Sequence, residues 1–548
     1  MISRLGQVSS NGTEMDYYPV LIDGAWRRAR ARSIFRAVNP ATGEELPGDY
    51  PLSDFADIED AVRAGRGAAL EMMTAAPESL ADYLELLGER IGGATEALAR
   101  MAARETGLPL DPRLRLVEIP RMIRQLRLAA DAARDRSWCR ATIDTQADIR
   151  SKYAPLGGPV VVFGPNNFPF ACNALGGTDF AAAIAVGNPV IAKAHPYHPG
   201  TTRLLAEIAF GCLEKSGLPP AAVQLIYHMQ PEDGLRCVAH PMLGAFAFTG
   251  SRPAALALKA AADKAGKPAY IETSSLNPVF LLPGALKTRA EEAADELFAS
   301  CTQGAGQFCT KPGLIVFIAD PAGFAFFKVL RSRFQGSQPG VLLGRSVLEG
   351  IETALAAMGN AGAEVVVGGK RVGATGFRFE NTLLHITGES FLRNPAPLQQ
   401  EAFGAVSLCV LCRNEDEMLG IAAVLEGNLA SSIYSHEDGA DEALYQRLEP
   451  VLRIKVGRLL NDRVPTGITV TASMVHGGPY PATGHPGFSS FGAPISFYRF
   501  AALHGYDRVR RHRLPPELQD RNPTGKMWRL IDGEWTRKNI ERPEERQA

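Results

Sequence analysis

The sequence predicts an α/β protein built on parallel β-sheets whose two faces are covered by helices. From residue 158 onward, short apolar runs alternate with segments in which apolar residues recur at helical spacing. The 548 residues are 46% hydrophobic and 21% charged, which is ordinary for a globular protein with large buried cores. At roughly 150 residues per domain, this length corresponds to about three or four domains.

The first half of the chain is expected to form one such sheet. Residues 58–135 have helical spacing, and alternation at 140–156 predicts a hairpin. Five strands separated by helical segments are then expected at 158–164, 188–194, 222–228, 243–250 and 267–273. Ligands of a parallel sheet bind at the carboxyl ends of its strands. No GxGxxG follows these strands, so a nucleotide site must be built differently.

A second αβ block is predicted from about 279 to 475, with strands such as GLIVFIA and VSLCVLC. A Gly/Pro-rich loop, VHGGPYPATGHPG, follows at 475–487, and a tail rich in Arg and Pro begins at 504. LIDGAW at 21–26 and LIDGEW at 530–535 place Asp-Gly between apolar residues. This pattern predicts two similar hairpins.

The composition gives no support to several classes of function. Lys and Arg (58) nearly balance Asp and Glu (59), so no nucleic-acid partner is expected. No apolar run reaches the roughly 18 residues of a membrane span, and the first 16 residues lack a signal core, so we expect a cytoplasmic protein. Of eight cysteines, only Cys409 and Cys412 have CxxC spacing. They lie in an apolar run that favours core packing, so no metal site is predicted.

Six short motifs occur in a fixed order: FGPNNFP (163–169), VIAKAHP (190–196), FTGS (248–251), YIETSSLNP (270–278), GQFC (306–309) and EAFG (401–404). Together they resemble the aldehyde dehydrogenase superfamily, over about residues 20 to 500. The resemblance implies a Rossmann-like cofactor-binding domain, an αβ catalytic domain and a small β oligomerisation element. These would occupy 16–139 with 157–275, 276–477, and 140–156 with 478–503, followed by a C-terminal extension at 504–548.

The resemblance makes Cys309 the nucleophile. In this family the thiol attacks the aldehyde carbon, hydride passes to the nicotinamide, and the resulting thioester is hydrolysed. Gly304 and Gly306 are expected to let the backbone approach a substrate, and the Cys309 N–H is one candidate oxyanion donor. Cys301, on an expected helix, is predicted to be a core residue.

Two further residues match the family's catalytic positions. Asn167 would donate to the developing alkoxide, although the chain reads N-N-F-P, with Asn166 in place of the usual tryptophan. Glu272 would activate the hydrolytic water, and desolvation at a strand end is expected to raise its pKa. Here E-T-S-S-L replaces the family's E-L-G-G-K. Because both glycines are lost, the resemblance does not fix the backbone conformation after Glu272.

The cofactor is expected to be NADP by preference, with NAD also possible. Lys193 matches the lysine that binds the adenine-side ribose, and Pro196 replaces the glutamate that excludes a 2′-phosphate in NAD-preferring members. His195 and His198 could add charge or donors near that phosphate, or could be ordinary loop histidines. The helix beginning near Thr201 could offer N–H groups to an anion.

The remaining cofactor residues also follow from the resemblance. Gly250 and Ser251 match a turn that opens a helix near the pyrophosphate, with Ala255 at the motif's closing glycine position. Glu401 and Phe403 match the pair that positions the nicotinamide ribose and ring.

One branch of the family is most similar in its motifs. KAHPYHPGT, GQFCTKPGL, SSLNPVFLLPGAL and VHGGPYPATG resemble the 2-oxoglutarate semialdehyde (2,5-dioxopentanoate) dehydrogenases, a branch that includes NADP-dependent fatty aldehyde dehydrogenases. Phe168, Phe170 and Phe308 are expected to form an apolar entrance. A dicarboxylic semialdehyde would require an arginine for its carboxylate, which the sequence does not single out.

The predicted function is oxidation of an aldehyde to the free acid by an NAD(P)-dependent aldehyde dehydrogenase. Two alternatives stay open: a CoA-acylating dehydrogenase, and a catalytically silent binding or structural member of the fold. By resemblance the protein would be a homodimer or homotetramer. The hairpin at 140–156 and a strand near 490–502 would extend a partner's sheet.

Overall fold

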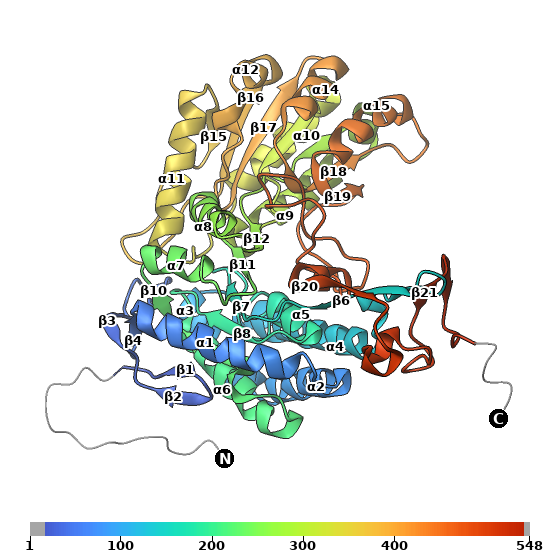
Figure 1. Cartoon of the computed structure of the whole chain (residues 1–548). Helices are drawn as coiled ribbons and strands as arrows, with labels where there is room; N and C mark the ends of the chain where they lie inside the picture. Colours follow the sequence, from blue (N-terminus) through green and yellow to red (C-terminus); the bar gives the residue numbers. More distant parts are fainter. Residues whose placement is uncertain (1–16, 542–548) are drawn as a thin grey trace, which may run out of the picture.

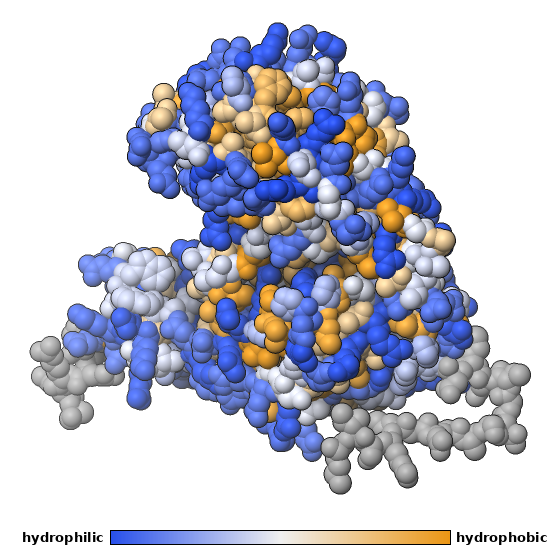
Figure 2. Space-filling model, turned by 180° about the vertical axis from the view of Figure 1, so that it is seen from behind, coloured by the Kyte–Doolittle hydropathy of each residue, from blue (hydrophilic) through white to orange (hydrophobic). Residues whose placement is uncertain are grey.

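The computed structural model describes residues 17–541, so the N-terminal stretch used to predict location and the last seven residues of the predicted C-terminal extension lie outside it. Figure 1 shows two αβ lobes, one formed by the first half of the chain and one by residues from β13 to β19. In the view from behind, the second lobe overhangs the first on one side (Figure 2). The described chain forms four sheets.

The first lobe contains a seven-stranded sheet in the order β12-β11-β7-β8-β9-β1-β2. Its five parallel strands confirm the predicted runs: β7 (Val160–Phe163), β8 (Val190–Lys193), β9 (Val223–Ile226), β11 (Ala245–Thr249) and β12 (Ala269–Glu272). The hairpin β1 (Val20–Ile22) and β2 (Ala25–Arg27) pairs antiparallel at one edge. Four helices connect the parallel strands: α5 (Thr178–Val186), α6 (Pro199–Ser216), α7 (Pro231–Val238) and α8 (Arg252–Lys264).

The helical region before this sheet is also as predicted. It contains α1 (Phe55–Met72), α2 (Pro77–Gly93), α3 (Thr95–Thr106) and α4 (Ile119–Asp135), with a π-helical turn at Leu110–Glu118 before α4. A small sheet of β3 (Ala31–Phe35), β4 (Tyr50–Ser53) and β10 (His228–Met229) lies beside it.

The second lobe is built on a sheet ordered β15-β16-β17-β14-β13-β18-β19. The strands are β13 (Val279–Leu281), β14 (Leu314–Ile318), β15 (Glu364–Val367), β16 (Thr382–Thr387), β17 (Val406–Cys412), β18 (Asn428–Tyr434) and β19 (Val456–Asn461), all parallel except β15. Its helices are α9 (Pro283–Thr302), α10 (Pro321–Gln335), α11 (Arg345–Asn360), α12 (Gly388–Arg393), α13 (Pro395–Leu398), α14 (Glu415–Val424) and α15 (Glu442–Arg453). Cys301, Cys409 and Cys412 are buried, which confirms the core packing predicted for them.

A separate five-stranded sheet joins the middle of the chain to its end, in the order β20-β6-β5-β21-β22. The predicted hairpin is β5 (Thr142–Asp144) and β6 (Ile149–Pro155). The strand predicted near 490–502 is wrong in position. Residues 495–500 form a 3-10 turn that buries Phe497 and Phe500, and β20 begins only at Ala501 and ends at Asp507.

The C-terminal tail completes this sheet rather than standing apart from it. β21 (Arg529–Ile531) pairs with β5 and forms a hairpin with β22 (Glu534–Thr536). Both Asp-Gly hairpins are confirmed, because Asp532 and Gly533, like Asp23 and Gly24, have positive φ. The functional roles assigned to the domains stay predictions.

The amino end of α6 is closed by a buried carboxylate. Glu105 on α3 accepts hydrogen bonds from the Gly200 N–H (2.7 Å) and from the N–H and hydroxyl of Thr201 (2.8 and 2.7 Å). The expectation that this helix end is open to an anion is therefore wrong, because the chain's own carboxylate occupies it. Burial raises the pKa of Glu105 to about 7.

We predict that Glu105→Ala lowers the midpoint of thermal unfolding by several degrees. The substitution leaves buried N–H donors without partners, at a cost of about 1–3 kcal/mol each. Glu96→Ala on the same helix is the matched control, since its ion pairs with Arg100 and Arg115 are exposed and worth about 0–1 kcal/mol. Equal shifts in the two variants, measured by calorimetry, would contradict the assignment.

Candidate active site

Cys309 lies in the loop between α9 and β14, and the glycines before it shape that loop. Gly304, Ala305 and Gly306 all have positive φ, from 56° to 72°. A Cβ at Gly306 would lie 2.3 Å from the Ala405 nitrogen. The expectation that these glycines make room for a substrate is corrected accordingly: Gly306 lets the loop pack against the backbone of the EAFG segment.

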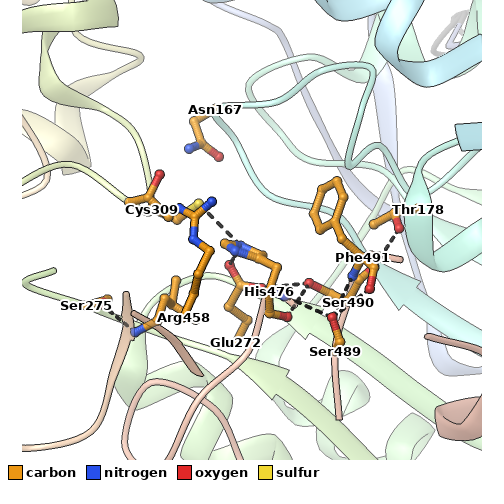
Figure 3. Close-up of polar contacts among 12 residues, drawn as sticks. Asn167, Thr178, Glu272, Ser275, Cys309, Arg458, His476, Ser489, Ser490 and Phe491 are labelled. Atoms are coloured by element: carbon orange, nitrogen blue, oxygen red, sulfur yellow. Dashed lines mark hydrogen bonds and ion pairs between the residues drawn. The ribbon is translucent and has the colours of Figure 1, made fainter. Parts of the chain in front are cut away.

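Three side chains distant in the sequence meet at the thiol (Figure 3). The Sγ of Cys309 lies 3.6 Å from Nε2 of His476, and the same Nε2 lies 3.0 Å from Oε1 of Glu272. Glu272 ends β12, and His476 follows β19 in the Gly/Pro-rich loop. Both are buried, and the Ser490 hydroxyl donates to the second Glu272 oxygen at 3.2 Å.

Glu272 and His476 form a buried ion pair. Burial acts to raise the pKa of Glu272, but the charge and hydrogen bond of His476 outweigh it, so that pKa is below its ordinary value. The expectation of a raised value is wrong because it did not include this partner. Burial lowers the pKa of His476, yet Glu272 and Cys309 together raise it to about 10. His476 is thus an imidazolium at neutral pH, and it places positive charge 3.6 Å from the sulfur of Cys309.

Sequence reasoning missed His476. Its one signal is a histidine before two glycines in a loop, and it is separated from Glu272 by 204 positions. No local periodicity connects residues so far apart.

Asn167 lies in the same cavity as Cys309. Its Nδ2 donates to the Gln307 carbonyl at 2.9 Å, which uses one of the two amide hydrogens. Its backbone carbonyl accepts from Arg113 at 3.0 Å, and this contact holds the loop in place. Within residues 17–541, no hydrogen bond occupies the backbone N–H of Cys309.

The six predicted cofactor residues line one open cleft that also reaches Cys309, Glu272 and Asn167. They are Lys193, His195, Gly250, Ser251, Glu401 and Phe403. The ammonium of Lys193, at the end of β8, has no hydrogen bond or ion pair within the described residues, and burial lowers its pKa to about 8. Ser251 is the N-cap of α8, but its hydroxyl makes no capping bond.

His195 and His198 do not add the positive charge that the sequence led us to consider, because both are buried. Burial lowers the pKa of His195 well below its ordinary value, so this residue is neutral. Its Nδ1 accepts a hydrogen bond from the Tyr197 N–H at 3.1 Å. The proton of the neutral ring is therefore on Nε2, which can donate to a ligand. His198 is buried and contacts the Pro165 carbonyl at 2.9 Å, so it is a core residue.

At Glu401, burial raises the pKa to about 7, against the opposing charge of buried Lys311.

The aromatic entrance is only partly as expected. Phe168 lines the cavity beside Cys309 and packs edge-on against Phe308, with 5.4 Å between ring centroids. Phe170 is completely buried in the main core, so its predicted place at the entrance is wrong.

The cleft joins a thiol, an imidazolium and a carboxylate to an unpaired lysine and an uncapped helix amino end, an arrangement that suits an oxidoreductase with a dinucleotide cofactor. Residues 26–450 match the aldehyde dehydrogenase family, and the chain belongs to this family. It is an NAD(P)-dependent aldehyde dehydrogenase that oxidises aldehydes to acids, as predicted.

Similar proteins agree with this assignment. The chain is 35% identical to alpha-ketoglutaric semialdehyde dehydrogenase 2 of Azospirillum brasilense, covering 94% of this chain and 98% of that one. It is 33% identical to the alpha-ketoglutaric semialdehyde dehydrogenase of Acinetobacter baylyi, covering 87% and 91%. A mutant of aldehyde dehydrogenase C from Pseudomonas syringae, in complex with NAD+ and octanal, has the same fold. Its TM-score is 0.77 at 21% identity, covering 89% and 96%.

The same fold occurs in 3,6-anhydro-L-galactose dehydrogenase in complex with NADP, with a TM-score of 0.76 at 21% identity, covering 90% of this chain and 99% of that one. The predicted fold class is confirmed. Between residues 17 and 541, no helix has the length and apolar character needed to cross a membrane.

The ion pair makes the stability of the protein depend on pH. The pKa of His476 is about 10 in the folded state and about 6.5 in an unfolded chain. Its protonated form therefore stabilises the fold fully below pH 6.5, and this contribution disappears as the pH rises through 10. We predict that His476→Asn lowers the unfolding temperature most near pH 6.5, with a difference from wild type that shrinks towards pH 10.

Scanning calorimetry at several pH values tests this prediction. His512→Asn serves as the matched control because His512 is exposed in the tail. A difference between His476→Asn and wild type that stays constant over this range would contradict the ion pair.

Proposed function

We propose that the enzyme oxidises 2-oxoglutarate semialdehyde, or a semialdehyde of similar length, with Cys309 as the nucleophile. The observation that carries the catalytic assignment is the Cys309–His476–Glu272 contact. Two relatives at 33–35% identity are alpha-ketoglutaric semialdehyde dehydrogenases, which supports the substrate. The cavity beside Cys309 is lined by Arg121 together with Phe168 and Phe491, so it offers both a cation and apolar contacts to a short semialdehyde.

The first half of the reaction depends on charge at the thiol. The sulfur of Cys309 attacks the aldehyde carbon as its proton leaves, and the His476 imidazolium beside it stabilises the negative charge that develops. The alkoxide formed there takes hydrogen bonds from the Asn167 amide and from the Cys309 N–H. The residues of the cleft fit NAD(P), which when bound supplies the hydride acceptor. Lys193 would hold the adenine-side ribose, Ser251 the pyrophosphate, and Glu401 with Phe403 the nicotinamide end.

The second half hydrolyses the acyl group. Acylation changes Cys309, which after Glu272 is one of the two side chains that raise the pKa of His476. The Glu272–His476 pair then accepts a proton from the attacking water. A built-in base of this kind supports release of a free acid and argues against transfer of the acyl group to CoA. Turnover in the absence of CoA separates the two reactions.

Glu272→Gln tests the assignment of the base. We predict that this variant still releases a burst of one reduced cofactor per active site, while steady-state turnover falls by about 10²- to 10⁴-fold because hydrolysis lacks its base. Stopped-flow absorbance and mass spectrometry of the acylated Cys309 measure the two effects. Loss of the burst together with turnover would place Glu272 before acylation instead.

The preference for NADP is proposed from Pro196. A carboxylate at this position would lie near a 2′-phosphate, whereas proline presents no charge. Lys193, without a partner nearby, supplies the positive charge, since His195 is neutral. NAD use is proposed as a secondary activity.

We predict that Pro196→Glu raises the KM for NADP by about 10- to 100-fold through repulsion of like charges, and changes the KM for NAD by less than about threefold. Steady-state kinetics with both cofactors measures this selectivity. Pro196→Gln is the matched control, because it adds a side chain of the same size without charge. Equal effects on both cofactors would indicate a purely steric change.

We also propose a homodimer or homotetramer, and a cytoplasmic location as predicted from the sequence. β20 and β19 are edge strands of their sheets. Leu503 on β20 is 65% exposed and Ile454, just before β19, is 72% exposed. An edge strand with exposed apolar side chains favours pairing with a second copy. Sedimentation analysis of the full chain tests the oligomeric state.

A further inference from the structure

The cavity beside Cys309 contains one arginine. Its lining includes Asn167, Phe168, Ile468 and Phe491, together with Arg121 from α4. The guanidinium of Arg121 lies between two aromatic rings, 5.4 Å from the centroid of Phe168 and 5.0 Å from that of Phe491. These rings hold the guanidinium at the wall of the cavity that also contains the nucleophile.

Two of the three guanidinium nitrogens of Arg121 are buried but unsatisfied. Within residues 17–541, Nε and Nη2 have no hydrogen-bond partner, and Arg121 forms no ion pair. A buried charged donor without a partner is costly, and native proteins seldom retain one without a function. These two N–H groups are adjacent on a planar fork, the arrangement that binds a carboxylate through two parallel hydrogen bonds.

The two carboxylates that line the cavity are both in ion pairs. Glu272 is paired with His476 at 3.0 Å, and Asp179 with Arg499 at 2.7 Å. This removes the two carboxylates of the cavity as partners for Arg121.

Both neighbouring arginines have partners for their terminal nitrogens, although the buried Nε of Arg113 has none among the described residues. Arg113 pairs with buried Glu118, and Arg458 donates to the carbonyls of Pro465 (2.6 Å) and Gly467 (3.1 Å). Among the residues that line this cavity, Arg121 is therefore the cation with two adjacent N–H groups that the described residues leave without a partner. A ligand that complements this cavity carries an anionic group at one end and an electrophilic carbon at the other.

We infer that Arg121 binds the distal carboxylate of the substrate and so makes the enzyme selective for short aldehydes that carry a carboxylate. The inference rests on the proposed function and deepens it. The aldehyde carbon lies at Cys309, the methylene chain contacts Phe168 and Phe491, and the carboxylate meets the Arg121 fork. This assigns the arginine that the sequence did not single out.

Kinetics with paired substrates tests the inference. The pairs are 2-oxoglutarate semialdehyde with pentanal, and succinic semialdehyde with butanal, each pair being matched in chain length. We expect Arg121→Met to lower kcat/KM for the semialdehydes by about 10- to 100-fold, as for the loss of hydrogen bonds to a charged group. The values for the neutral aldehydes should change by less than about threefold. Arg121→Lys should lie between, because lysine keeps the charge without the fork.

Arg124→Met is the matched control, since Arg124 is exposed on the same helix. A second readout needs no turnover. Isothermal calorimetry measures the affinity of glutarate for the Cys309→Ala variant, and for double variants that also carry Arg121→Lys or Arg121→Met. Affinity should fall at least tenfold when Arg121 is replaced. This measurement stays decisive if Arg121→Met folds poorly, because Arg121→Lys preserves the size and charge of the side chain.

The outcomes separate the two hypotheses. A wild-type enzyme that oxidises none of these aldehydes would reject the proposed substrate class. A wild-type enzyme that oxidises them, with Arg121→Met reducing both members of each pair equally or leaving glutarate binding unchanged, would overturn only the role of Arg121.

Discussion

The buried ion pair between Glu272 and His476 is the interaction on which the rest of the site depends. Glu272 belongs to the first lobe, Cys309 to the second, and His476 to the loop that follows the second. Removing one member of a buried pair leaves an uncompensated charge, which is strongly destabilising. Because the three residues come from different parts of the fold, His476 reaches Cys309 only when both lobes and the loop have assembled.

The loop is held to the first lobe by its backbone as well as by the histidine. The Thr273 N–H donates to the Ala482 carbonyl at 2.8 Å, and Glu272 forms a bridge with Thr483. The His476 N–H donates to the Ser489 hydroxyl at 2.9 Å. These contacts fix the imidazole independently of the substrate, as preorganised electrostatic catalysis requires.

Much of the fold could be predicted from the sequence. The five strands of the first sheet were identifiable because each is a short apolar run between helical segments, and the Asp-Gly pairs marked both hairpins. The strand at 501–507 was misplaced because aromatic residues before it resemble strand residues but are buried in a turn. The catalytic motifs located Cys309, Glu272 and Asn167, and the structure brings all three to one cavity.

Chain order and residue type determined the family, the cysteine proposed as the nucleophile and the strand–helix alternation, because these depend on local patterns. Tertiary structure decided which charges are paired. His476 became the partner of Glu272, Glu105 occupied a helix end that seemed open, and Arg121 was left without a partner among many arginines. The physical reason is that the state of a charge depends on burial and on neighbours hundreds of positions away, which no local pattern records.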